Sequence, residues 1–271
     1  METRTPRAEL RAQAINVCLH SVAITLLIGL PVLVSAKSPE SLLDAVGTIY
    51  CDGKVRGSAV YISPPQEIAD DLALVVTAAH TLFDLQNGQS YKACEYRPQN
   101  KRLSGIAVRR VSKHGYLITD SDKIAQAESD IAFLVLSYPP RQSALHFGQQ
   151  SQPISGPLAL LGYRAELDDI ALSAPCQPVD IDQPPNPALL FHNCQAGAGT
   201  SGAPIVDLSS GRIVAIHGGA LVFDRHGRTQ QSAAIQREQV DPSQWINQGR
   251  MIDTEIIELL KAFLESSPSD Q

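Results

Sequence analysis

Residues 72–80 read LALVVTAAH, an apolar run that ends in two alanines and a histidine. The β-branched Val75, Val76 and Thr77 make this run typical of a buried strand. A histidine directly after such a strand can face a cleft while the strand fixes its backbone, although a single histidine is more often a surface residue. The stretch therefore predicts a β-rich fold, with His80 at the end of a core strand.

Similar short apolar runs, bounded by turn residues, occur along most of the chain. They cover 45–51, 57–62, 103–111 and 131–136 in the first half, and 157–163, 170–176, 188–194, 204–206, 213–216 and 231–235 in the second. Only residues 254–265 have a clear helical period, with Asp253 or Thr254 as the cap. Many short strands without alternating long helices favour barrels or sandwiches.

The composition limits the possible partners. A length of 271 residues suits one large all-β domain or two small ones, and 44% of the residues are hydrophobic. A core of that kind needs no oligomerisation, so we expect a monomer. The net charge of −6 gives no basic footprint for nucleic acid.

The first 36 residues differ from the rest. Three arginines precede an apolar run at 14–36, which ends Val34-Ser35-Ala36. Small residues after such a run predict a secretory signal peptide over 1–36, cleaved after Ala36. The mature protein would then be secreted or periplasmic and free of the membrane. The alternative is an uncleaved anchor, because the run approaches the length that spans a bilayer.

Cysteine usage agrees with export. Cys18 lies within the predicted signal, and four cysteines remain after it. An even number of cysteines in an exported protein predicts disulfides, and four allow three pairings. We favour Cys51–Cys94 and Cys176–Cys194, because each pair stays within one half of the chain. No Cys-x-x-Cys motif is present, so we expect no metal site.

The segment Gly199-Thr200-Ser201-Gly202-Ala203-Pro204 suggests a nucleophile. A serine hydroxyl needs a base to take its proton and backbone amides to stabilise the oxyanion. Glycine two residues earlier lets its own amide and that of Ser201 point into one hollow. Alone, the segment could equally be an ordinary Gly-Ser turn.

Asp130 is the candidate acid. It directly precedes the buried run IAFLVL at 131–136, whereas Asp120 and Asp122 are farther from it. A carboxylate next to a buried strand is costly unless it is paired, and the N–H of a histidine ring is a suitable partner. A solvent-exposed strand start is the simpler alternative.

Together these motifs resemble the trypsin-like serine peptidases, and more closely their bacterial V8-like (glutamyl endopeptidase-like) branch. The matching stretches are GSAVYI (57–62), VVTAAH (75–80), SDIAFLVL (129–136), HNCQAGAGTSGAPIVD (192–207) and IVAIHGGAL (213–221). The order His, Asp, Ser also matches. The resemblance implies an all-β, chymotrypsin-like fold of two six-stranded antiparallel β-barrels with a C-terminal helix. Its barrels would cover 37–140 and 141–271.

The resemblance also implies roles for individual residues. His80, Asp130 and Ser201 would be the catalytic triad of a serine endopeptidase that acts on polypeptides without a cofactor. The amides of Gly199 and Ser201 would form the oxyanion hole. Thr200 stands where digestive enzymes carry an aspartate that captures a new N-terminus, so activation of that type is not expected.

Five residues would bind substrate by the same resemblance. They are Gln195, Ala196, His217, Gly218 and Gly219. Gln195 occupies the position of the acid that selects basic residues in trypsin, so a basic preference is not expected. His217 matches a histidine that helps glutamyl endopeptidases bind an acidic side chain. Ala196 replaces their pocket hydroxyl, so a glutamate preference rests on His217 alone.

Two other functions fit parts of this pattern. A trypsin-like fold can persist as a catalytically silent binding module, although all three triad positions are occupied here. An esterase of the α/β-hydrolase type would need G-x-S-x-G, but Ala203 stands at the last position. The alternation of strands and helices required by that fold is also missing.

Overall fold

The computed structural model describes residues 39–64, 72–99, 103–148, 153–181, 187–223 and 245–266. The predicted signal over 1–36 and the predicted strand at 231–235 lie outside these residues. By contacts the chain divides into Met1–Ser35 and Ala36–Gln271, and all described residues belong to the second unit. None of the described helices has the length and apolarity needed to span a bilayer.

The first half forms a closed antiparallel barrel with the strand order β1-β2-β3-β6-β5-β4. Its strands are β1 (Val46–Cys51), β2 (Lys54–Ile62), β3 (Leu74–Thr77), β4 (Cys94–Pro98), β5 (Ile106–Val111) and β6 (Ala132–Leu136). Strands β3 and β6 are buried along their whole lengths, as their continuous apolar sequences predict. This half confirms the predicted barrel.

The second half is a six-stranded antiparallel sheet with the order β8-β7-β10-β11-β12-β9. Its strands are β7 (Leu158–Arg164), β8 (Asp169–Leu172), β9 (Leu189–His192), β10 (Pro204–Asp207), β11 (Arg212–Val222) and β12 (Trp245–Met251). Isolated bridges pair Cys176 with Leu158 of β7 and Pro178 with His192 of β9. The short segment after β8 therefore links the two sides of this sheet and gives it the character of a second barrel.

The described helices are short except the last. They are α1 (Pro39–Leu43), the 3-10 turn η1 (Ala79–Leu82), α2 (Lys123–Glu128) and α3 (Thr254–Glu265). Helix α3 confirms the predicted C-terminal helix, and its cap is Asp253, whose Oδ1 accepts from the amide of Ile256 at 3.0 Å.

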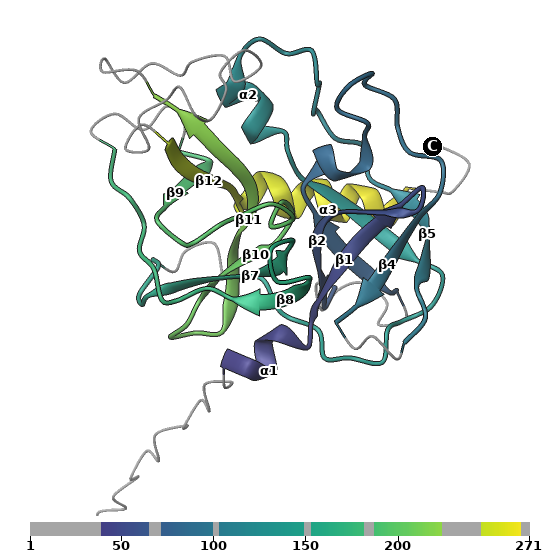
Figure 1. Cartoon of the computed structure of the whole chain (residues 1–271), viewed down its shortest axis with the longest axis horizontal. Coiled ribbons are helices and arrows are strands. Elements are labelled where there is room, and N and C mark those ends of the chain that lie inside the picture. The colour runs from purple at the N-terminus through teal and green to yellow at the C-terminus, as the bar shows by residue number, and fades with distance from the viewer. Residues whose placement is uncertain are drawn as a thin grey trace, which may run out of the picture. The chain divides into compact units, whose positions relative to one another are not determined.

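Helix α3 packs against both halves. In Figure 1 it runs from β12 toward β5, where Arg110 donates to the carbonyl of Phe263 at 2.5 Å. Its buried Ile256 and Leu260 belong to an apolar cluster that also contains Val60 of the first barrel and Ile216 of the second sheet. The two halves thus share part of one core.

Both predicted disulfides are confirmed. Cys51–Cys94 joins β1 to β4, and Cys176–Cys194 joins the bridging segment to the residues after β9. A cross-link of this kind contributes about 2–4 kcal/mol by restricting the unfolded chain.

Candidate active site

His80 is placed by the end of β3 and by a buried acid. Thr77, the last residue of β3, donates its hydroxyl to the carbonyl of Ser58 at 2.7 Å and so ties this end of the strand to β2. The backbone amide of His80 donates to Asp130 Oδ1 at 2.9 Å, and His80 Nδ1 lies 2.7 Å from Asp130 Oδ2. Asp130 therefore fixes both the backbone and the ring of His80.

Asp130 lies between α2 and β6 and is only 4% exposed. Burial lowers the pKa of His80, but the charge of Asp130 and its hydrogen bond raise it, and the net shift is upward. The carboxylate thus favours the imidazolium form of His80, the form that a general base takes after it accepts a proton.

Ser201 lies on a loop that docks against the same strands. Its carbonyl accepts from the amide of Ser58 at 2.7 Å. Gly199 and Gly202 have φ values of +93° and +83°, which favour glycine. A side chain at Gly202 would overlap the Ser58 carbonyl and the Thr77 hydroxyl. This close approach holds Ser201 next to the end of β3, from which His80 follows.

Within the described residues, the Ser201 hydroxyl and two amides of this loop are free to bind a ligand. Among them, Ser201 Oγ has no hydrogen bond to His80, and the amides of Gly199 and Ser201 have no acceptor. Catalytic hydrogen bonds often tighten only when substrate is bound. The two free amides are the donors that an oxyanion requires.

The strand after the serine passes beside the His–Asp pair. A Cβ on Gly218 would lie 3.1 Å from Asp130 Oδ2. Gly218 also sits at an irregularity in the β11–β12 pairing, and Gly219 has a φ of +142°. The structure therefore brings Gly218 next to the predicted triad.

The side chain of His217, the residue of β11 before Gly218, is buried rather than open to solvent. It is 2% exposed, and its Nδ1 lies 3.2 Å from His192 Nε2. Burial lowers the pKa of His217 to about 3 and that of His192 to about 4, so both rings are neutral near pH 7. Of the other predicted substrate-binding residues, Gln195 is exposed and Ala196 is half-buried.

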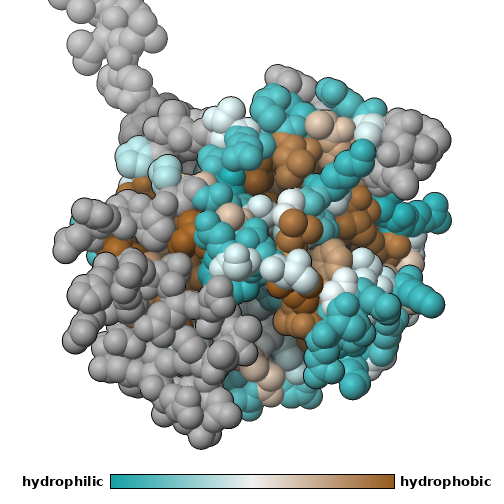
Figure 2. Space-filling view, turned by 90° about the horizontal axis from the view of Figure 1, so that it is seen from above, coloured by the Kyte–Doolittle hydropathy of each residue, from teal (hydrophilic) through white to brown (hydrophobic). Residues whose placement is uncertain are grey.

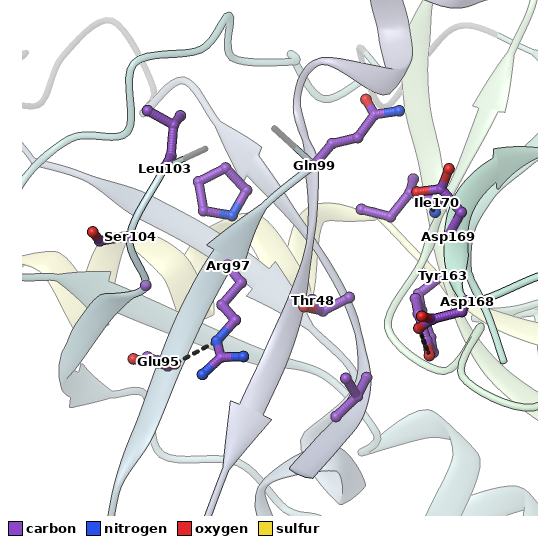
Figure 3. Close-up of a pocket in the computed structure, with 13 residues that line it drawn as sticks. Thr48, Glu95, Arg97, Gln99, Leu103, Ser104, Tyr163, Asp168, Asp169 and Ile170 are labelled. Atoms are coloured by element: carbon purple, nitrogen blue, oxygen red, sulfur yellow. Dashed lines mark hydrogen bonds and ion pairs between the residues drawn. The ribbon is translucent and has the colours of Figure 1, made fainter. Parts of the chain in front are cut away.

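Two cavities are candidates for a substrate site. The smaller one, of about 180 Å³, is lined by His80, Asp130, Gly218, Gly219 and Gln248 among others. The larger one, of about 600 Å³, is shown in Figure 3, where dashed lines join Glu95 to Arg97 and Tyr163 to Asp168. None of the predicted triad residues lines this larger cavity, so the smaller one is the candidate site for substrate.

Figure 2 shows the molecule from above. On the coloured part of this face, apolar surface lies in several patches between polar side chains.

Within the described ranges, no three His, Cys, Asp or Glu side chains come together as metal ligands.

Sequence reasoning missed three residues of this site. Ser58 and Thr77 connect β2, β3 and the serine loop, and their only signal is a hydroxyl within an apolar strand. Gln248 has no sequence signal, because β12 reads WINQGRM without apolar alternation.

Solved structures with the same fold include proteases. A Glu endopeptidase bound to MPD is 12% identical, with a TM-score of 0.53 over 83% of this chain and 92% of that one. A thermostable serine protease from an extremophilic microorganism is 15% identical, with a TM-score of 0.55 over 83% and 100%. A protease from M. tuberculosis in its active form is 16% identical, with a TM-score of 0.52 over 88% of each chain. At these identities the similarity concerns the fold alone, and it confirms a chymotrypsin-like architecture.

The fold and the His–Asp pair beside a glycine-bounded serine define the class of chymotrypsin-fold serine peptidases. The family model of the trypsin-like peptidase domain matches residues 57–216, more than half of the chain and a range that contains His80, Asp130 and Ser201. The chain therefore belongs to the trypsin-like peptidase family, and it is a serine endopeptidase. No curated protein matches it in sequence.

Proposed function

We propose that this protein is a secreted, V8-like serine endopeptidase in which His80, Asp130 and Ser201 form the catalytic triad. The observation that carries the proposal is the His80–Asp130 pair, with Nδ1 and Oδ2 2.7 Å apart, beside a serine loop anchored to the same strands. Two disulfides support export, because such bonds persist in oxidising compartments. We also propose 1–36 as the signal, and 37–140 and 141–271 as the two barrel domains.

In the proposed mechanism, Ser201 Oγ attacks the scissile carbonyl while His80 Nε2 takes its proton. His80 Nδ1–H donates to Asp130 Oδ2, and this hydrogen bond holds the ring in the tautomer that leaves Nε2 free to accept. The amides of Gly199 and Ser201 donate to the oxyanion. His80 then protonates the leaving amine, and water hydrolyses the acyl-enzyme at Ser201.

A free strand edge supports the assignment of Gly218 and Gly219 to substrate binding. Among the described strands, β10 pairs with β11 only as far as Ile216, whereas β12 pairs with β11 through Val222. Within the described residues, one edge of β11 after His217 therefore has no pairing strand, and an extended peptide can pair with such an edge. A substrate bound there would pass beside His80. Gln195 and Ala196, which precede the serine loop, would form the wall of the same cleft.

Hydrolysis of a mixed peptide library by the purified protein tests this function. We expect cleavage by the wild type and none above background by Ser201→Ala. A folded, disulfide-bonded wild-type protein that binds peptides but does not cleave them would instead be the silent binding module. The esterase alternative loses its support because both sheets are antiparallel, unlike those of an α/β-hydrolase.

The glutamate preference remains a proposal that rests on His217. The ring is neutral near pH 7, and it is buried and bonded to His192 and to the Gln248 backbone, so a substrate carboxylate would have to replace one of these contacts to accept its N–H. We expect matched peptides with Glu before the cut site to be cleaved faster than those with Ala or Leu. Equal rates for the three peptides would remove this preference and leave the triad assignment intact.

A further inference from the structure

Gln248 is a buried polar side chain with an unused acceptor. It lies on β12 and is 4% exposed. Within the described part of the chain, its Oε1 has no hydrogen-bond partner. Buried polar atoms are almost always paired, since an unpaired one loses its hydration without compensation. Because Oε1 is enclosed by protein atoms, a ligand in the neighbouring cavity completes its bonding when the Gln248 carboxamide turns toward that cavity.

The amide of Gln248 reaches the site because residue 218 has no side chain. Gln248 pairs with Gly219 across β11 and β12. A Cβ on Gly218 would lie 2.5 Å from Gln248 Nε2 and 3.1 Å from Asp130 Oδ2. Glycine at 218 therefore leaves room for the Gln248 carboxamide beside the acid of the proposed triad.

The cavity that Gln248 lines has walls of distinct chemistry. His80 and Tyr116 form one side, the β11 segment from Gly218 to Leu221 forms another, and Lys123 and Gln126 contribute from α2. Lys123 Nζ donates to the carbonyl of Asp120 at 3.0 Å and to Gln126 Oε1 at 3.1 Å. An ammonium carries three N–H groups, so one donor of Lys123 is left among the described contacts.

These walls discriminate between classes of side chain. A carboxylate is attracted by Lys123 but repelled by Asp130, and it brings no donor for Gln248 Oε1. A cationic side chain is attracted by Asp130 but repelled by Lys123, and it brings no acceptor for Lys123 or Gln248 Nε2. An apolar side chain leaves Oε1 unpaired. A primary amide supplies an N–H to Oε1 and a carbonyl to Lys123 or to Gln248 Nε2. The volume of about 180 Å³ has room for one such side chain.

We propose that this cavity is a subsite for the amide side chain of an Asn or Gln residue that flanks the scissile bond, with Gln248 as its specificity-determining residue. The inference rests on the proposed peptidase function, because a peptide held on the free edge of β11 would direct a side chain into this cavity.

The test is cleavage of peptides varied one position at a time on both sides of the cut site, with Asn, Gln, Leu, Glu or Lys. For the full chain we expect kcat/KM at one position to be about 10- to 100-fold higher for an amide than for Leu, since the apolar side chain leaves Oε1 unpaired. Gln248→Met should abolish this preference and raise the rate for the Leu peptide. Gln142→Met is the matched control, because Gln142 Oε1 is also buried without a described partner and does not line the cavity. It should leave the preference unchanged.

A second variant keeps the subsite testable if Gln248→Met does not fold. Gln248→Asn keeps the amide but shortens its reach, so we expect the preference to shift from Asn toward the longer Gln. An amide preference that is absent in the wild type, or that survives both changes at Gln248, would overturn the subsite and leave the peptidase function intact.

A wild type that cleaves no peptide would overturn the proposed function instead. Fluorescence polarisation with Ser201→Ala and the same peptides then tests the subsite by itself. Tighter binding of the amide peptide, lost on adding Gln248→Met, would support the subsite. Equal binding of the amide and Leu peptides, or no binding of either, would contradict it.

Discussion

The two sheets bury different kinds of polar side chain. In the first barrel these are mainly small hydroxyl residues and one acid, namely Thr48, Ser58, Thr77, Thr81, Ser112 and Asp130. In the second sheet and its loops they include longer and more basic groups, namely His192, His217, Gln248 and Arg250. A hydroxyl is satisfied by nearby backbone, as Thr77 is by the Ser58 carbonyl. The longer groups need partners from distant segments.

This difference separates two tasks. In the proposed assignment, the first barrel uses a largely apolar framework to fix the base His80 and its acid Asp130. The second sheet and its loops carry the proposed nucleophile Ser201 together with longer buried polar groups, which we propose determine the substrates that the cleft accepts. The first barrel should therefore govern the turnover rate, whereas the second sheet should govern substrate specificity and the pH dependence of stability.

The largest expected effect comes from breaking the pair in the first barrel. Asp130→Asn keeps the shape of the side chain but can present an N–H to His80 Nδ1, which favours the wrong tautomer. We expect kcat to fall about 10⁴-fold with the ranking of peptide substrates unchanged. Steady-state kinetics on a peptide series measures both quantities. A loss below about tenfold would mean that Asp130 does not hold the catalytic ring.

A smaller effect, on stability, is expected from Arg250 in the second sheet. This arginine is 2% exposed and donates to the carbonyls of Glu128 and Ala188 at 2.9 and 3.3 Å, and to Asp253 at 2.5 Å. Arg250→Met should lower the free energy of unfolding by about 2–4 kcal/mol, because the carbonyls of Glu128 and Ala188 lose a charged donor.

Urea unfolding of Arg250→Met and Arg250→Lys measures this contribution. Lysine keeps the charge but cannot bond all these acceptors together, so it should fall between the wild type and Met. A loss of less than about 1 kcal/mol in the Met variant would contradict the assigned role.

The smallest effect is the pH response of the His192–His217 pair. Their folded pKa values of about 4 and 3 lie below the ordinary value of 6.5. The unfolded chain therefore binds more protons between these values, and stability falls as the pH drops from 6.5 toward 4. We expect the urea midpoint to be lower at pH 5 than at pH 7, and His217→Gln to reduce that difference. An unchanged difference in the variant would show that other groups cause the acid response.

The same contrast explains how much could be predicted from sequence. Strands β3 and β6 and the residues His80 and Asp130 were accessible because an apolar run predicts a buried strand and places the polar residue at its end. The cap at Asp253 and the period of α3 were accessible for similar local reasons. Strand β4 was missed because only Tyr96 and Pro98 of its five residues are buried.

Strand β12 was missed for the opposite reason. Gln248 and Arg250 are buried there, so polarity no longer marks exposure, and their partners lie on α2, β11 and α3. The unpaired Oε1 of Gln248 depends on contacts between segments far apart in the chain. Such a feature leaves no local pattern in the sequence.

Labelling with a fluorophosphonate probe tests the central claim most directly, because the probe needs an activated serine and not a matching peptide. The folded wild-type protein should form one covalent adduct, and peptide mapping should place it on Ser201. Ser201→Ala should form none, and His80→Ala should label at least about 10³-fold more slowly, because the base is lost. Labelling that persists in Ser201→Ala, or a folded wild type that does not react, would contradict the assignment of His80, Asp130 and Ser201 as the triad.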